Sequence, residues 1–160
     1  NHAGLLEVSE THRPDLVYCA EFLSDDIGLA DLDPEAWNAS YKDARVTHVA
    51  ALDPGFVWGI DGDDLAGLLP NVTLIGLGDG DDRLAAADFD ASGFALHLPG
   101  ARTERLAPAT HFSAMPICTP AGAAILAEEQ DDPVCTDPAG ASREAHHAQI
   151  IDIIATDLGL

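Results

Sequence analysis

The chain has 160 residues, 47% of them hydrophobic, which is enough for one domain with a buried core. Its formal net charge of −21 comes from 28 acidic residues against 7 lysines and arginines. A surface this acidic repels nucleic-acid phosphates and anionic membranes, so we expect neither as a partner. No apolar run approaches the roughly 18 residues that a membrane span needs, so we expect no such span.

The excess of acidic residues has two interpretations. One is a solvated surface of the halophilic kind, supported by the presence of a single lysine, Lys42, in the whole sequence. The other is metal binding. Calcium loops have an Asp-x-Asp-x-Asp-Gly run with a distal Glu, which neither 61–64 nor 79–82 has. His146 and His147 are adjacent and would point about 100° apart on a helix. The surface interpretation is therefore favoured, and we expect no metal and no cofactor.

The first 45 residues predict little regular structure beyond one helix. Residues 1–24 indicate a loosely apolar helix that ends near Cys19, and residues 25–45 indicate a surface excursion with at most one helical turn. The composition of the sequence changes after residue 45. The segment near 46–52 is short, apolar and β-branched, and it stops at Asp53-Pro54-Gly55. This pattern predicts a buried strand that enters a turn.

Two further strands are expected, a buried one near 72–78 and a shorter, more polar one near 102–107. A short helix over 61–69, ended by Pro70, and a weak helix over 84–98 connect them. Strands that alternate with helices predict a parallel sheet covered on both faces, hence the α/β class. Three strands are few for this architecture, so something must cover the other edge of the sheet.

Two helices are expected after the third strand. Residues 119–129 form an alanine-rich helix, with Pro120 in the first turn where a missing N–H costs nothing. Residues 142–158 give the clearest helical pattern, with Ser142 as the N-cap. The apolar face predicted for this helix consists of Ala148, Ile151, Ile154, Ala155 and Leu158.

The cysteines are Cys19, Cys118 and Cys135, an odd number without a CxxC pair, which argues against a zinc site. Cys118 and Cys135 flank the short helix and could close a loop, which would suit an oxidising compartment. We therefore expect a secreted or periplasmic location, with a cytoplasmic location as the alternative.

Polar groups follow all three predicted strands: Asp53 the first, the acidic turn 79–82 the second and His111 the third. Sites in open parallel sheets form at such strand ends. An acid followed by a histidine is the last two thirds of a Ser/Asp/His relay in one of its chain orders. Each feature also has a plainer interpretation, since Asp and Gly are common in turns and a histidine before Phe is often packing.

Three segments carry a resemblance to a known family: RVTHVAALDPGFVWG, VTLIGLGDGDD and LPGARTERLAPATHFSAMPICTPAG. They resemble the C-terminal half of α/β-hydrolases called predicted dienelactone hydrolases, close to the platelet-activating-factor acetylhydrolases. The resemblance covers about residues 43–158 well and 1–42 only loosely. It implies one partial α/β-hydrolase domain over 1–160. Residues 1–42 would be the helix and excursion after the nucleophile, and 43–160 the half with the acid and the histidine.

The resemblance also implies roles for individual residues. His111 resembles the triad base, and Asp81 resembles the triad acid because Gly78-Asp79-Gly80-Asp81 matches the family's Gly-x-x-Asp turn. Asp79 or Asp82 takes that role if the turn is shifted.

Trp58 lies where the family has an aromatic residue that lines the cleft, although core packing explains it equally well. Phe112, next to the histidine, is the second candidate substrate-binding residue. The cysteine after the family's histidine matches Cys118, and Cys135 resembles its disulfide partner.

The sequence departs from the family at the nucleophile. No Gly-x-Ser-x-Gly or Gly-x-Cys-x-Gly occurs, and Ser9 and Ser24 lack the context of a nucleophile elbow. The expected function is thus the C-terminal part of a serine-type hydrolase acting on small-molecule esters. Its nucleophile would lie on a separate or missing N-terminal fragment or chain. The alternative is a non-catalytic binding or structural subunit that keeps a degenerate half-fold.

Overall fold

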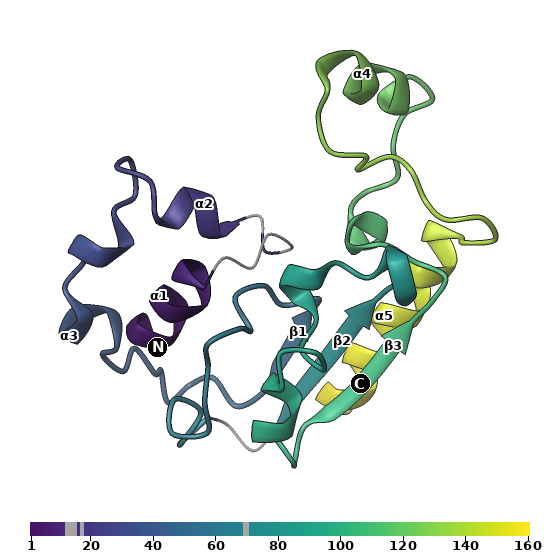
Figure 1. The fold of residues 1–160 in the computed structure, drawn as a ribbon. Helices are drawn as coiled ribbons and strands as arrows, with labels where there is room; N and C mark the ends of the chain where they lie inside the picture. Colours follow the sequence, from purple (N-terminus) through teal and green to yellow (C-terminus); the bar gives the residue numbers. More distant parts are fainter. Residues whose placement is uncertain (12–15, 17, 69–70) are drawn as a thin grey trace.

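Three parallel strands form the centre of the molecule (Figure 1). A computed structural model describes residues 1–11, 16, 18–68 and 71–160. The strands are β1 (Val49–Leu52), β2 (Val72–Leu77) and β3 (Arg102–Leu106), in the order β1-β2-β3. Val49 pairs with Val72, and Thr73 pairs with Arg102. The predicted α/β class and parallel sheet are confirmed, but β1 is shorter than expected and only partly buried instead of buried.

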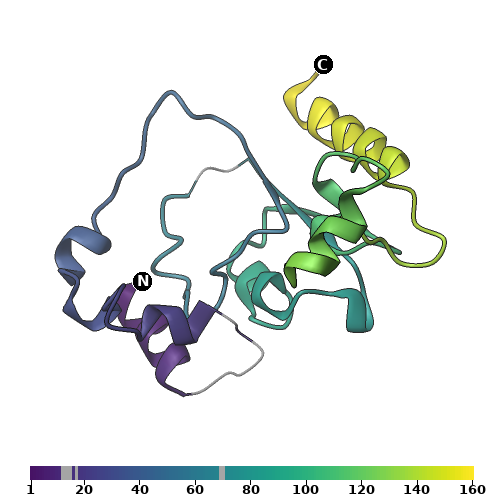
Figure 2. The ribbon, with the colours of Figure 1, turned by 90° about the horizontal axis from the view of Figure 1, so that it is seen from above.

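Each face of the sheet has its own apolar cluster, because alternate residues of β2 point to opposite sides. Ile75 and Leu77 pack against Ile150 and Ile153 of α5 (Arg143–Leu158). Val72 and Leu74 pack on the other face with Val57 and Phe89. Every residue of β2 is buried, as predicted for the central strand. Figure 2 shows α5 on one side of the sheet and the segment around residues 80–98 on the other.

Helix α5 begins where the sequence predicts, with the Ser142 hydroxyl accepting the Ala145 N–H at 3.3 Å. The predicted apolar face is only partly right, since Ile154 packs against the sheet but Ile151 is 67% exposed and Leu158 is 51% exposed. The buried face instead carries Arg143, His146, Ile150 and Ile153. Both stripes have helical spacing, so periodicity alone does not distinguish them.

The predicted helix over 1–24 is two helices, α1 (His2–Glu10) and α2 (Tyr18–Phe22). Helix α1 ends at Thr11, and a proline at sequence position 14 is incompatible with a helix interior. Residues 12–15 and 17, over which that prediction also ran, lie outside the described residues.

The surface excursion over 25–45 contains slightly more helix than predicted. It has one 3₁₀ turn, η1 (Leu29–Asp31), besides the single α-helical turn α3 (Pro34–Trp37). The Asp33 carboxylate accepts the Glu35 N–H at 3.0 Å and so caps α3.

Helix α1 approaches the body of the molecule at Gly4 and Gly59. A Cβ at Gly4 would lie 1.9 Å from the Gly59 carbonyl oxygen, so only two glycines permit this backbone contact. Nearby, Leu16, Cys19 and Ala86 form a buried apolar cluster, with Trp58 against it. The N-terminal helices are therefore packed onto the segments that follow β1 and β2.

The predicted helix over 61–69 is wrong, because residues 61–68 form turns. The Asp61 carboxylate accepts the N–H groups of Asp63 (2.9 Å) and Asp64 (3.1 Å). Such local bonds compete with helix formation. Leu69 and Pro70, the predicted end of this helix, lie outside the described residues.

The weak helix predicted over 84–98 is also wrong. Two short 3₁₀ helices occupy this stretch, η3 (Ala85–Ala87) and η4 (Phe94–His97). Between them the Asp88 carboxylate accepts the N–H groups of Asp90 (3.1 Å) and Ala91 (3.0 Å). These bonds stabilise a turn where the prediction has continuous helix.

The disulfide between Cys118 and Cys135 is present, with 5.7 Å between the two Cα atoms. It closes a loop that holds α4 (Gly122–Glu129), which projects away from the sheet in Figure 1. This helix lies within the predicted range 119–129 and starts after Pro120. The expected pairing is confirmed, and so is the helix, except that Pro120 precedes the helix instead of lying in its first turn. Cys19 is free and buried.

Candidate functional site

The side chains of His111 and Asp53 meet at the carboxyl end of the sheet. Asp53 directly follows β1, and His111 is the first residue of the 3₁₀ helix η5 (His111–Ala114) that comes after β3. Nδ1 of His111 lies 2.6 Å from Oδ2 of Asp53, so the contact crosses the end of β2. The Asp53 side chain is 2% exposed and that of His111 is 38% exposed. A buried acid thus faces a histidine that reaches the surface.

Asp53 is held from three sides. Its Oδ1 accepts the Leu77 N–H at 3.0 Å and an Nη1–H of Arg83, while its own N–H donates to the Ile75 carbonyl at 2.7 Å. Its backbone has a φ of 45°, in the left-handed region that non-glycine residues rarely adopt. Such strain persists where the surroundings impose it, and it is often found at functional sites.

Arg83 supplies the positive charge beside Asp53. Its side chain is 8% exposed, and it donates to the carbonyl oxygens of Leu77 (3.0 Å) and Ala87 as well as to Asp53. Its guanidinium also lies 5.2 Å from the ring centroid of Phe89. A buried carboxylate is stable only when it is paired and hydrogen-bonded, and Arg83 meets both needs.

Gly78 lets the two loops at this end of the sheet come together. Its φ is 81°, and a Cβ there would lie 2.6 Å from the carbonyl oxygens of both Ala109 and Asp82. The acidic turn after β2 and the segment that carries His111 therefore touch at a position that only glycine can occupy.

Asp81 lies near His111 but does not pair with it. Asp81 is exposed, at the rim of a pocket of about 240 Å³ that His111 also lines. Over residues 1–11, 16, 18–68 and 71–160, no hydrogen bond or ion pair joins His111 to Asp79, Asp81 or Asp82. The structure thus brings Asp53 to His111, where the resemblance pointed to Asp81. The sequence signal for Asp53 was its position directly after a predicted strand.

The two aromatic candidates lie in different places. Phe112 lines the same pocket as His111, and its ring packs edge-on against the imidazole with centroids 5.6 Å apart. Trp58 is half-buried between two apolar clusters and donates its indole N–H to the Ala85 carbonyl at 2.9 Å. The pocket beside His111 is lined by Phe112 but not by Trp58.

Within the described part of the chain, no serine or cysteine is hydrogen-bonded to His111. Ser113, two positions along, donates its hydroxyl hydrogen to Oδ1 of Asp137 at 2.8 Å. Cys19 is buried in the N-terminal apolar cluster. The arrangement thus consists of a partly exposed imidazole whose Nδ1 faces a buried carboxylate.

Neither a metal centre nor a membrane span is found in the ranges that the structure describes. No three His, Cys, Asp or Glu side chains there are arranged to hold a metal ion. His147, half of the adjacent histidine pair, lies with Nε2 3.1 Å from the Met115 carbonyl oxygen, while His146 is buried. No described helix combines the length and the apolar character needed to cross a membrane.

Comparison of the chain with protein-family models, with curated proteins and with solved structures yields no match.

Proposed function

We propose that the chain is the acid and histidine half of a serine-type carboxylic ester hydrolase. The observation that carries this proposal is the contact between Asp53 and His111 at the end of the sheet. A buried, hydrogen-bonded carboxylate against Nδ1 of a partly exposed histidine is the pairing that a Ser/His/Asp relay requires. In this assignment Asp53 takes the role of the triad acid, in place of Asp81.

The chemistry follows from the positions of the two imidazole nitrogens. With Nδ1–H donating to Asp53, Nε2 is the free base that removes the proton from a nucleophile hydroxyl. The nucleophile attacks the ester carbonyl, and His111 returns the proton to the departing alkoxide. Asp53 keeps the imidazole in the right tautomer and stabilises the imidazolium formed in between. Arg83 fixes Asp53, so that little reorganisation accompanies the proton transfer.

The nucleophile and the oxyanion hole belong, in this proposal, to polypeptide outside these 160 residues. Serine is the nucleophile that the resemblance implies. The substrate is an ester of a small or medium acyl group, in keeping with a pocket of about 240 Å³ beside His111 and Phe112. The disulfide suits an oxidising compartment, which favours a secreted or periplasmic enzyme.

The test uses material purified from the native source, with every polypeptide that accompanies this chain. Intact-mass analysis identifies companion fragments, and a fluorophosphonate probe labels an activated serine. We expect one companion serine to react and an ester analogue to protect it. His111→Ala should abolish the labelling and lower kcat for a p-nitrophenyl ester by several orders of magnitude.

A matched control for this test is His97→Ala, which removes an exposed histidine at the end of η4. It should leave labelling and turnover within a few-fold of the parent. Near-normal turnover by the His111→Ala variant would overturn the proposal. The absence of any labelled polypeptide would favour a non-catalytic subunit.

A further inference from the structure

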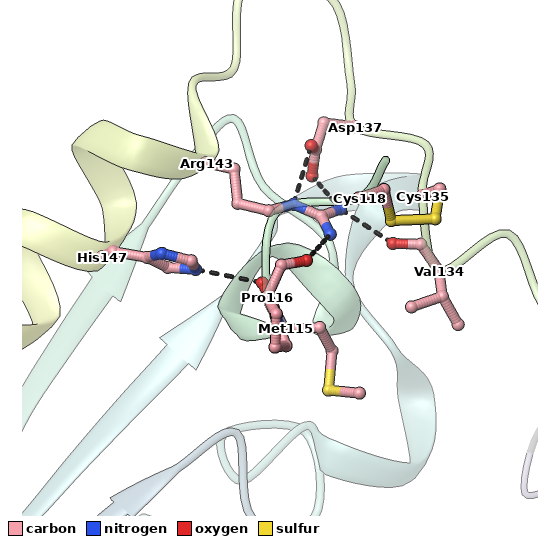
Figure 3. Close-up of a disulfide and its surroundings, with 8 residues drawn as sticks. All are labelled: Met115, Pro116, Cys118, Val134, Cys135, Asp137, Arg143 and His147. Atoms are coloured by element: carbon pink, nitrogen blue, oxygen red, sulfur yellow. Dashed lines mark hydrogen bonds and ion pairs between the residues drawn. A yellow bond between two sulfur atoms is a disulfide. The ribbon is translucent and has the colours of Figure 1, made fainter. Parts of the chain in front are cut away.

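A second set of polar contacts holds the segment that carries His111. Its centre is Asp137, in the segment between the disulfide and α5. Arg143, the first residue of α5, donates from Nε to Oδ2 of Asp137 at 3.0 Å and from Nη2 to Oδ1 at 2.9 Å (Figure 3). The Arg143 side chain is 6% exposed. This is a two-pronged, largely buried ion pair, a geometry with high directional precision.

Ser113 connects this ion pair to the segment that carries His111. It is fully buried, and its hydroxyl donates to Oδ1 of Asp137 at 2.8 Å. The Ser113 hydroxyl oxygen in turn accepts the Thr110 N–H at 2.9 Å. Thr110 and Ser113 bracket His111 in the chain, so the bonds run without a break from Arg143 to the backbone on both sides of the imidazole.

Helix α5 also holds the segment that follows η5. Arg143 donates from Nη1 to the Pro116 carbonyl at 3.3 Å, and His147 can donate from Nε2 to the Met115 carbonyl at 3.1 Å. Arg143 reaches the base of the disulfide loop as well, through the Val134 carbonyl at 2.8 Å. Figure 3 shows Arg143 at the centre of these contacts, beside the disulfide. One arginine therefore ties three segments together.

We propose that Asp137 and Arg143, acting through Ser113, are positioning residues that set the orientation of His111 toward Asp53. This inference rests on the proposed function. None of the three residues touches the reacting atoms. They hold the backbone between Thr110 and Ser113 in place, and this backbone sets the position from which the His111 side chain extends. Proton transfer depends steeply on such placement, since a shift of about 1 Å can cost on the order of 10²-fold in rate.

A purely structural role is the competing explanation, because Arg143 also anchors the start of α5. The structural and the positioning explanations predict different effects on the bond between His111 and Asp53 in a variant that still folds. A structural role changes the stability and leaves the bond between His111 and Asp53 as it is. A positioning role changes that bond even in a variant that remains folded.

The experiment follows the imidazole Nδ1–H proton of His111 by NMR in the full chain, which requires no substrate. The parent should show a downfield resonance from the bond to Asp53, and His111→Ala assigns it by its loss. We expect Ser113→Ala and Asp137→Ala to shift this resonance or broaden it away. Asp137→Asn keeps an oxygen for the Ser113 hydroxyl and should retain the resonance in part. Glu128→Gln, on exposed α4, is the matched control and should leave it unchanged.

A kinetic arm uses the enzyme with its companion polypeptide. There Ser113→Ala should lower kcat on the order of 10²-fold with little change in KM, because substrate binding does not involve this network. Should Asp137→Ala fail to fold, Ser113→Ala, which removes only one oxygen, decides the matter. A parent resonance that is present and unaltered in folded Ser113→Ala refutes the positioning role alone. A parent chain without the resonance contradicts the proposed function itself.

Discussion

Asp53 and His111 lie 58 positions apart in the chain, and yet Oδ2 of one is 2.6 Å from Nδ1 of the other. The contact joins the ends of β1 and β3 across β2, so it exists only when the parallel sheet has its observed order. The other carboxylate oxygen of Asp53, Oδ1, accepts hydrogen bonds from the Leu77 N–H and from Arg83. The acid is therefore fixed by the sheet, and the histidine is fixed against it.

The first prediction separates the two candidate acids. Asp53→Asn should lower kcat for a p-nitrophenyl ester on the order of 10⁴-fold in the complete enzyme, because an amide can stabilise the wrong imidazole tautomer. Asp81→Asn makes the same chemical change on the exposed rim and should cost no more than a few-fold. A larger loss of kcat for Asp81→Asn than for Asp53→Asn would identify Asp81, in the turn after β2, as the triad acid.

The second prediction concerns the buried charge pair. Arg83→Met keeps an unbranched apolar side chain but removes the guanidinium that donates to the Asp53 carboxylate and to the carbonyls of Leu77 and Ala87. Breaking a buried pair in this way should lower the free energy of unfolding by about 3 kcal/mol. Urea denaturation followed by circular dichroism measures the change.

The control for Arg83 is Arg45→Met, at an arginine whose side chain is 90% exposed beside Asp43. Its urea midpoint should equal that of the parent. Equal midpoints for both variants would mean that Arg83 does not stabilise Asp53.

The third prediction tests the contact between α1 and the segment after β1. Gly4→Ala places a methyl group 1.9 Å from the Gly59 carbonyl oxygen, so the helix must move. We expect a loss of about 1–3 kcal/mol, as for other overpacked contacts. Gly100→Ala has no atom within 4 Å of its added Cβ and serves as the control. Thermal melting compares the two variants, and equal melting temperatures would contradict the contact.

The fourth prediction concerns the disulfide. Its two cysteines are separated by 17 positions, and closing a loop of that length contributes about 3 kcal/mol in the chain-entropy description. A variant with both Cys118→Ser and Cys135→Ser should unfold at lower urea concentration than the oxidised parent. Dithiothreitol should lower the midpoint of the parent and leave that of the double variant unchanged. A parent insensitive to reduction would show that the loop is held by its other contacts.

The fifth prediction follows from the environment of Asp137. Partial burial alone would raise the pKa of this carboxyl, but hydrogen bonds from Arg143 and Ser113 outweigh it and hold the pKa below its usual value. A lowered pKa in the folded state means that the carboxylate stabilises the fold above the ordinary aspartate value near 4. That stabilisation is lost as the pH falls through the lower folded value.

Urea midpoints at constant ionic strength measure this pH dependence. The deficit of Asp137→Asn relative to the parent should be complete at pH 7 and should shrink below about pH 4. Ser113→Ala removes one of the three hydrogen bonds that Asp137 accepts and should show the same trend to a smaller degree. A deficit that does not vary with pH would contradict the role of the charged form.

Much of the fold could be predicted from local sequence. The strands β2 and β3, α4 and the start of α5 come from apolar runs, breakers and caps that act over a few residues. The helix predictions over 61–69 and 84–98 were wrong for a reason that is equally local. Asp61 and Asp88 bond to nearby backbone N–H groups, and a periodic pattern carries no information about that competition.

The sequence by itself determined that His111 and several acids lie at strand ends of a parallel α/β sheet, because strand ends are set by short apolar runs. It also indicated that Cys118 and Cys135 could pair. Only the tertiary structure decided which acid meets the histidine. The turn 79–82 lies closer to His111 in the chain, but Asp53 reaches it because β1, β2 and β3 lie side by side and Arg83 neutralises the buried carboxylate. Distance along the chain does not report distance across a sheet, and the burial that favours Asp53 is a property of the assembled fold.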